Sequence, residues 1–171
     1  MSGIKMTLPN GSVKEVPAGT TLEEISRMDG VLDSPSPVMA AMVNGKITEL
    51  SVPMMESAQL VFLTLAHMDG YRIYQRSLLL LFLRSAREVL EPEARIYVKH
   101  SIGNGIYCEI EESGQFRRDP KEAVRCIEAR MRELVKKPER IQQMLLDLPD
   151  AMEKAKEMGL NARLRLFRYR R

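Results

Sequence analysis

Residues 5–22 read KMTLPNGSVKEVPAGTTL, and this segment predicts a β-hairpin followed by a helix. Apolar and polar residues alternate on either side of Asn10-Gly11, and both residues of that pair tolerate the positive φ angles of a type I′ hairpin turn. Thr20 or Thr21 can cap the helix that follows, and the two glutamates after them are favoured by the positive end of the helix dipole. The segment therefore predicts a short hairpin that leads directly into a short helix.

The first 66 residues hold the elements of a β-grasp unit. A second Asn-Gly pair, Asn44-Gly45, predicts another hairpin, and Gly and Pro within residues 30–37 predict a loop. In the helix, Leu22 and Ile25 lie three residues apart and mark its buried face. The predicted strands are 4–8, 13–16, 39–43, 46–49 and 59–65, and the predicted helix is 21–28. The order β-β-α-β-β-β is what a ubiquitin-like β-grasp needs, so we assign residues 1–66 to such a domain.

A second unit is assigned to residues 71–171, with His67 to Gly70 interpreted as a hinge. An apolar stripe of Val124, Ile127, Met131 and Leu134 marks the buried face of its middle helix. Residues 140–146 fit a helix or a strand equally well. The predicted helices are 71–90, 120–137 and 149–158, and the predicted strands are 94–99, 105–111 and 161–167. Helices and strands in both units make the chain α+β.

Charge is distributed unevenly between the two units. Residues 1–70 carry a net charge of −4 and residues 71–171 a net charge of +7, which allows an anionic partner for the second unit. The longest apolar run, Leu78 to Leu83, is far shorter than the roughly 20 residues of a membrane span. No secretory signal is visible, and Cys108 and Cys126 lack a metal-binding spacing. We therefore expect a cytoplasmic protein with two reduced thiols.

Three stretches of the first unit carry a family resemblance. Residues 7–12 (TLPNGS), 17–22 (PAGTTL) and 40–45 (AAMVNG) resemble the TGS domain. This β-grasp module occurs at the N-terminus of threonyl-tRNA synthetases and in several regulatory proteins. The resemblance covers nearly the whole first unit.

The second unit resembles the domain that follows TGS in threonyl-tRNA synthetase, the editing domain. In that family a helix carries His-Ser and a second His four residues after the first, and a later Cys and His complete a metal-dependent deacylation site. Here Ser77 is kept, but Arg76 and Leu80 stand at the two histidine positions, and the sequence has no Cys-x-x-x-His. The resemblance therefore implies an editing-domain-like, two-layer α/β unit that lacks the catalytic histidines, with no catalytic residue and no metal ligand.

A second resemblance extends from end to end of the chain. Residues 74–78, 100–110 and 163–170 resemble a bacterial class in which a TGS domain and a degenerate editing-like domain precede a uridine kinase (phosphoribulokinase-like) domain. The phosphate loop of such kinases, G-x-x-x-x-G-K-[ST], is not in this sequence. No cofactor is therefore assigned to this chain, and ATP and Mg²⁺ are expected only if a kinase domain follows.

The leading hypothesis is that the chain is the non-catalytic N-terminal region of a uridine-kinase-like nucleoside kinase. In this role it would regulate the kinase or bind a ligand or RNA. Its candidate partners are RNA or a nucleotide and a C-terminal kinase domain, and no membrane is expected. One alternative is a stand-alone threonyl-tRNA synthetase-related protein that binds RNA or deacylates mischarged tRNA. Another is a TGS protein-interaction module. No active site is visible in the sequence, so whether the parent protein is an enzyme stays open.

Arginines supply most of the candidate binding residues. Arg72, Arg76 and Arg84 recur along the long helix and could present guanidinium groups to phosphate or RNA. The alternative is a solvated face in which they pair with nearby glutamates. Arg163 and Arg165 alternate with leucines in the basic tail, which fits either a stripe that contacts an RNA backbone or a charged strand edge.

His100 is the remaining candidate, because it precedes Gly103-Asn104-Gly105 and could lie above a phosphate-binding loop. The glycines are explained more simply by a hairpin turn, and a loop with no helix N-terminus after it is a poor phosphate site. The hairpin could bring His100 near Cys108, but no third group is evident to orient such a pair. No catalytic role is assigned to either residue.

Overall fold

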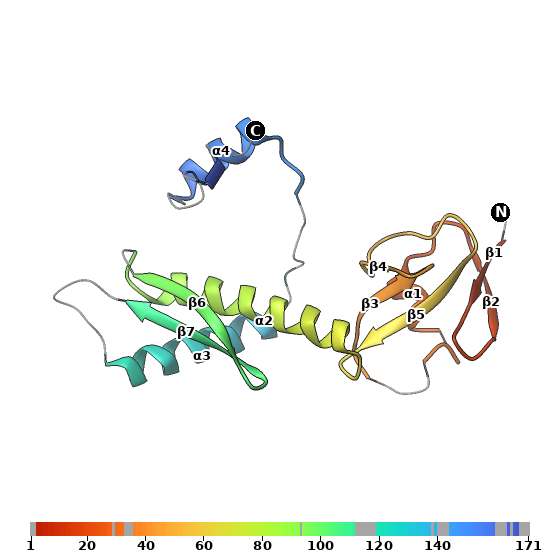
Figure 1. Ribbon diagram of the computed structural model, residues 1–171, viewed down its shortest axis with the longest axis horizontal. Coiled ribbons are helices and arrows are strands. Elements are labelled where there is room, and N and C mark those ends of the chain that lie inside the picture. Colours follow the sequence, from red (N-terminus) through yellow and green to blue (C-terminus); the bar gives the residue numbers. More distant parts are fainter. Residues whose placement is uncertain are drawn as a thin grey trace. The chain divides into compact units, whose positions relative to one another are not determined.

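The computed structural model describes residues 3–28, 30–32, 36–92, 94–111, 119–137, 139, 144–159, 164 and 166–167 (Figure 1). The backbone separates into two compact units, Met1–Glu133 and Leu134–Arg171. The domain division at residues 66–71 falls inside the first of these units and stays a prediction.

In chain order the elements are β1 (Gly3–Thr7), β2 (Val13–Pro17), α1 (Leu22–Ser26), β3 (Val38–Val43), β4 (Lys46–Thr48), β5 (Ala58–Thr64), α2 (Met68–Val89), β6 (Arg95–Ile102), β7 (Gly105–Glu111), α3 (Pro120–Lys136) and α4 (Leu148–Glu157).

Five strands form one mixed sheet in the order β2-β1-β5-β3-β4. β1 and β5 run parallel, and the other neighbours are antiparallel. All five strands predicted for this part of the chain are present, within one or two residues at each end. The predicted α+β class is confirmed at this level, as a mixed sheet with helices.

Helix α1 begins at a capping box. The backbone N–H of Glu24 donates to Thr21 Oγ1 (3.2 Å), and the N–H of Thr21 donates to Glu24 Oε2 (2.8 Å). Leu22 and Ile25 are fully buried in one core with residues of the five-stranded sheet. The predicted cap and the predicted buried face of this helix are both confirmed.

The two Asn-Gly pairs form different turns. At Asn44-Gly45 both residues have positive φ (49° and 83°), as the predicted hairpin turn requires. At Asn10-Gly11 only Gly11 has positive φ (80°), and its N–H donates to the Leu8 carbonyl (2.9 Å). The type I′ prediction is wrong there, because Pro9 has a fixed negative φ and suits the first central position of a type I turn, after which glycine takes the left-handed position.

The hinge predicted at residues 67–70 is wrong. Met68, Asp69 and Gly70 form the first turn of α2, and the N–H of His67 donates to the Thr64 carbonyl (3.1 Å). Gly70 is buried, and a β-carbon there would collide with the carbonyl oxygen of Thr64. Strand β5 therefore turns into α2 over three residues.

Strands β6 and β7 form a separate two-stranded antiparallel sheet. A register shift between Val98 and Ser101 places Lys99 and His100 opposite the single residue Tyr107, which is a β-bulge. Gly103 in the turn has a φ of 56°. The glycines of this segment thus form the hairpin turn that the sequence favours over a phosphate loop.

Helices α2 and α3 share a core with this hairpin. Ala86, Leu90, Ala123 and Ile127 are buried together, and Phe82, Ile96, Ile110 and Met131 are among the half-buried side chains around them. Val124, predicted in the buried stripe of α3, is 58% exposed, and Ala123 is buried in its place. Ala123 and Val124 lie four and three residues before Ile127, so both are on its side of the helix. Sequence spacing alone therefore does not decide which of the two is buried.

The compact unit Leu134–Arg171 contains α4. Its N-cap residue, Asp147, accepts a hydrogen bond from the Asp150 N–H (3.0 Å). The helix predicted at 149–158 is confirmed. The strand predicted at 161–167 is wrong where it can be tested, because Leu164, Leu166 and Phe167 are helical. Leu and Arg are good helix formers, and Leu164 and Phe167 are half-buried three residues apart, as on one helical face.

No helix in the described ranges combines the length and the apolar character that a bilayer crossing needs.

We predict that Gly70→Ala lowers the free energy of unfolding by about 2 kcal/mol, because the new methyl group must push the Thr64 carbonyl away. Urea denaturation of the full chain measures the change. Gly105→Ala is the matched control, because a β-carbon there meets only the Ile102 carbonyl at 3.5 Å, an ordinary contact. Equal effects of the two substitutions would contradict the close approach at Gly70.

Candidate functional site

An open cleft of about 520 Å³ lies between α2, the β6–β7 hairpin and α3. One side of α2 supplies a wall at helical spacing: Tyr71, Tyr74, Gln75, Leu78, Leu79 and Phe82. Strand β7 contributes Ile106, Cys108 and Ile110, and α3 contributes Val124 and Met131. The cleft is therefore mainly apolar, with aromatic rings concentrated on the α2 side.

Two hydrogen bonds join the hairpin turn to α2. The Tyr71 hydroxyl donates to the Asn104 carbonyl (3.0 Å), and Gln75 Nε2 donates to the same oxygen (3.1 Å). These bonds satisfy a turn carbonyl and fix the hairpin tip against the first half of α2. The cleft is therefore built by tertiary contacts, and no single sequence segment encodes it.

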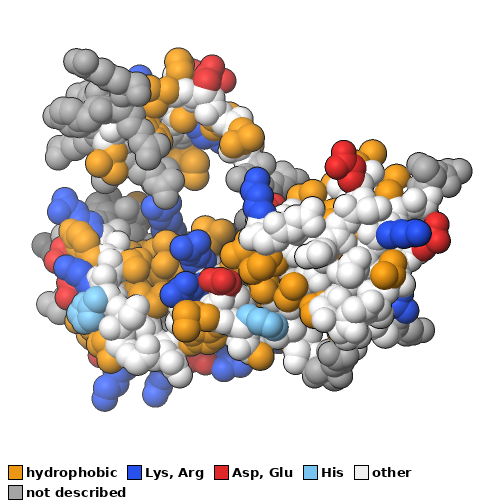
Figure 2. All heavy atoms as spheres, turned by 45° about the vertical axis from the view of Figure 1, so that its right-hand side comes forward, with side chains coloured by type: hydrophobic (Ala, Val, Ile, Leu, Met, Phe, Trp, Pro, Cys, Tyr) orange, Lys and Arg blue, Asp and Glu red, His pale blue; other side chains and the backbone are white. Residues whose placement is uncertain are grey.

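The mouth of the cleft exposes apolar side chains. Tyr74 and Leu78 are 40% and 41% exposed, and Val124 on α3 is more exposed still. Figure 2 shows that exposed hydrophobic side chains and Lys and Arg side chains both occur on the visible face. Apolar side chains exposed together at the mouth of a cleft are typical of a surface that binds a ligand or a partner.

Arg72 and Arg76 do not line the cleft, although both lie on α2. Arg72 is exposed and its NH1 lies 3.4 Å from the Asp69 carboxylate, a weak surface pair. Arg76 is exposed and makes no ion pair within the described part of the chain. These two guanidinium groups are available to an anion, and they stay candidate binding residues.

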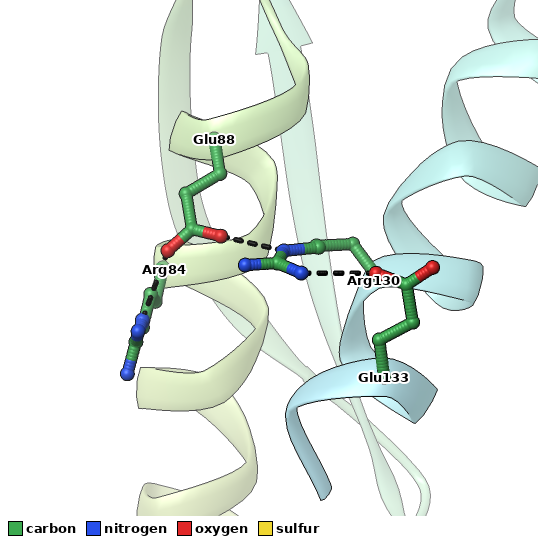
Figure 3. A network of polar contacts seen from close by, with 4 residues as sticks. All are labelled: Arg84, Glu88, Arg130 and Glu133. Carbon is green, nitrogen blue, oxygen red and sulfur yellow. Dashed lines mark hydrogen bonds and ion pairs between the residues drawn. The ribbon is translucent and has the colours of Figure 1, made fainter. Parts of the chain in front are cut away.

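Arg84 belongs to a network that joins α2 to α3 (Figure 3). Glu88 accepts from Arg84 Nε (3.0 Å) and from Arg130 Nε (2.6 Å), and Arg130 NH1 also reaches Glu133 (2.9 Å). Hydrogen bonds from Arg130 and then Arg84 lower the pKa of Glu88, and the two carboxylates raise the pKa of Arg130. Arg84 therefore has a structural role in this network. Its pairing with Glu88 agrees with the alternative in which the arginines of the long helix pair with nearby glutamates on a solvated face.

His100 lies in the β-bulge, exposed to solvent, with its ring 5.4 Å from the ring of Tyr107. Cys108 faces the cleft, and its Sγ is 3.9 Å from the Ile106 carbonyl. Burial raises the pKa of the Cys108 thiol, which disfavours the thiolate that a nucleophile needs.

Arg163 and Arg165 lie outside the described residues. Within the described ranges, no three His, Cys, Asp or Glu side chains cluster as metal ligands would. The cleft itself was not predicted from the sequence, because its walls come from three elements that only the fold brings together. A signal was present in the sequence, since Tyr71, Tyr74, Leu78 and Phe82 recur on one helical side.

No protein-family model matches the chain. Similar proteins include the threonine–tRNA ligases of Parabacteroides distasonis (32% identical over 162 residues, 91% of this chain and 23% of the enzyme) and Pelodictyon phaeoclathratiforme (31% over 150 residues, 88% and 22%). The threonine–tRNA ligase of Pelobacter propionicus is 25% identical over 167 residues, 98% of this chain and 26% of the enzyme. The chain is homologous to a region of threonyl-tRNA synthetase.

The chain spans about a quarter of the length of the curated relatives it matches. The homology covers α2 and the hairpin as well as the five-stranded sheet, since the alignment with the Pelobacter propionicus enzyme extends over 98% of the chain. The predicted link to a uridine kinase is not shown by these relatives, which are all tRNA ligases.

We predict that the Glu88 network stabilises the fold in a pH-dependent way. Because the folded pKa of Glu88 lies below the ordinary value of 4.5, its contribution is present above that pH and is lost as the pH falls through the folded pKa. Glu88→Gln should therefore lower the thermal midpoint at pH 7, and the difference from the unsubstituted chain should shrink in acid.

Thermal melts followed by circular dichroism between neutral and acidic pH measure this difference. Glu56→Gln, at an exposed site, is the control. A constant gap between Glu88→Gln and the unsubstituted chain down to the acid limit would contradict the prediction.

Proposed function

We propose that this chain is a threonyl-tRNA synthetase-related module that binds RNA of the tRNA class and does not deacylate it. The observation that carries the proposal is the homology to threonine–tRNA ligases over 88 to 98% of the chain. Within it, residues 1–66 are a TGS β-grasp domain and the following residues are an editing-like unit. This is one of the alternatives that the sequence leaves open, and the comparisons favour it over the nucleoside kinase.

The fold supports the assignment of the first part. Its five strands and α1 follow the order β-β-α-β-β-β, with β1 and β5 parallel in the middle of the sheet. A β-grasp requires this arrangement of two hairpins and a helix around a parallel pair. The TGS assignment further rests on the three sequence stretches 7–12, 17–22 and 40–45.

The absence of deacylation rests on the residues at two positions of α2. Arg76 and Leu80 stand where the editing family has histidines, and neither side chain can hold a metal ion in the way an imidazole does. His67 is the N-cap residue of α2 and His100 lies in the hairpin bulge, so both histidines of the sequence lie away from these positions. The module therefore acts by binding.

Phosphate contacts would come from the exposed arginines of α2. Arg72 and Arg76 are one helical turn apart and solvent-exposed, so one RNA strand can reach both. Residues 71–171 carry a net charge of +7, which attracts a polyanion at long range. Arg84 is held by Glu88 and contributes less.

We predict that the full chain binds a tRNA transcript and that affinity falls as salt rises from about 50 to 200 mM, because counterions leave the RNA on binding. The double variant Arg72→Gln/Arg76→Gln should weaken binding about tenfold. It should also reduce the slope of log affinity against log salt by about 0.9 for each phosphate that the variant no longer neutralises. Fluorescence anisotropy with end-labelled RNA measures both quantities.

The charge-matched control is Arg27→Gln/Arg132→Gln, which removes two exposed, ion-paired arginines, one at the C-cap of α1 and one on α3. Equal losses of affinity in the two double variants would mean that only net charge matters. Absence of binding at low salt would overturn the proposed function. Zn²⁺-dependent release of the amino acid from aminoacyl-tRNA would overturn its non-catalytic part.

A further inference from the structure

Aromatic side chains are concentrated on one side of α2. The whole chain has five tyrosines and four phenylalanines, and Tyr71, Tyr74 and Phe82 form one wall of the cleft. Phe82 packs against the core, whereas Tyr74 is 40% exposed at the mouth. Tyr74 thus lines the cleft and is accessible to a ligand from solvent.

The size and chemistry of the cleft restrict the ligand. A volume of about 520 Å³ is within the range of small-molecule sites and suits a nucleobase with part of its sugar. The Tyr71 hydroxyl and Gln75 Nε2 already donate to the Asn104 carbonyl, so few donors remain to read the edge of a base. Stacking and apolar contact would then supply most of the affinity, with little preference among the four bases.

Cations lie on the same helix as the aromatic wall. Arg72 and Arg76 are exposed and alternate along α2 with Tyr71, Tyr74 and Gln75. Aromatic rings beside guanidinium groups are the usual combination in proteins that bind single-stranded RNA, because bases stack while phosphates pair with the cations. A nucleotide strand that places one base against Tyr74 keeps its phosphates within reach of this helix.

We propose that the cleft binds an unpaired nucleobase of a single-stranded RNA segment, stacked on Tyr74. This inference rests on the proposed function and names the part of the RNA that the module holds. The site is separate from the positions of the editing histidines, because Arg76 and Leu80 do not line the cleft.

Cys108 provides a direct readout, because it lines the cleft and is a free, half-buried thiol. Cys126→Ser in the full chain leaves Cys108 as the single cysteine. Its alkylation by N-ethylmaleimide is followed by mass spectrometry with and without a single-stranded oligoadenylate of about eight nucleotides. We predict that saturating oligonucleotide slows alkylation of Cys108 at least about fivefold, because a stacked base covers the thiol.

Tyrosine variants test whether the oligonucleotide binds by stacking on the Tyr74 ring or only by filling the cleft. Tyr74→Leu should lose the protection and weaken binding of the oligonucleotide about tenfold, whereas Tyr74→Phe should keep both, because it keeps the ring. Tyr97→Leu is the control for loss of a tyrosine elsewhere, since Tyr97 is half-buried and does not line the cleft, and Lys99 lies over its ring. Circular dichroism melts of each variant check that the fold is intact.

The outcomes distinguish this inference from the proposed function. If anisotropy shows binding of tRNA with an Arg72- and Arg76-dependent salt slope while Cys108 alkylation is unchanged by oligoadenylate, the cleft inference fails and the proposed function stands. Equal losses of affinity for Tyr74→Leu and Tyr97→Leu would also overturn it. Protection by free adenosine at the same concentration as the oligonucleotide would overturn the RNA strand as the source of the base.

Discussion

A two-stranded antiparallel sheet is only marginally stable in water, and the β6–β7 hairpin needs a cover on its apolar face. Helices α2 and α3 supply that cover. Small residues of both helices are buried in this region: Ser85 and Ala86 on α2 are fully buried, and Ala123 on α3 is nearly so. Among the described atoms, the buried Ser85 hydroxyl has no hydrogen-bond partner. The two helices and the hairpin thus stabilise one another through a shared core. The cleft and the polar network described below are built on this packing.

The cleft is a consequence of how this core is distributed along α2. Ala86 and Leu90, in the last turns of the helix, lie in the core with Ala123 and Ile127 of α3. The earlier turns continue the same apolar stripe from Tyr71 to Phe82, but there the stripe forms an open wall that faces the hairpin. One continuous sequence pattern therefore serves two purposes, a buried core at one end and an accessible surface at the other. The polar network of Arg84, Glu88, Arg130 and Glu133 joins the same two helices from the solvent side.

Local patterns in the sequence predicted most of the elements. Thr21 with Glu24, the buried pair Leu22 and Ile25, and the Asn44-Gly45 turn each depend on neighbours within a few residues, and each is found. Two of the failures share a cause, which is competition between two local rules. Pro9 overrides the turn preference of Asn10-Gly11, and a short Arg-Leu alternation near residues 161–167 gives way to helix at Leu164, Leu166 and Phe167. The candidate site was harder, because no local rule says which arginine meets a glutamate 42 residues away or that a stripe of core-like residues stays open.

The junction between β5 and α2 also determines how the protein can be divided for study. Thr64 ends the last strand, His67 is the N-cap residue of the helix, and Gly70 lies against the backbone of Thr64 with no room for a side chain. A fragment that starts at residue 71 would lack the first turn of α2 and would leave the Tyr71 N–H without the His67 carbonyl to which it donates (2.9 Å). A fragment that stops at residue 66 would expose the end of β5. Separate expression of the two parts therefore calls for overlapping boundaries, with residues 64–70 included in both.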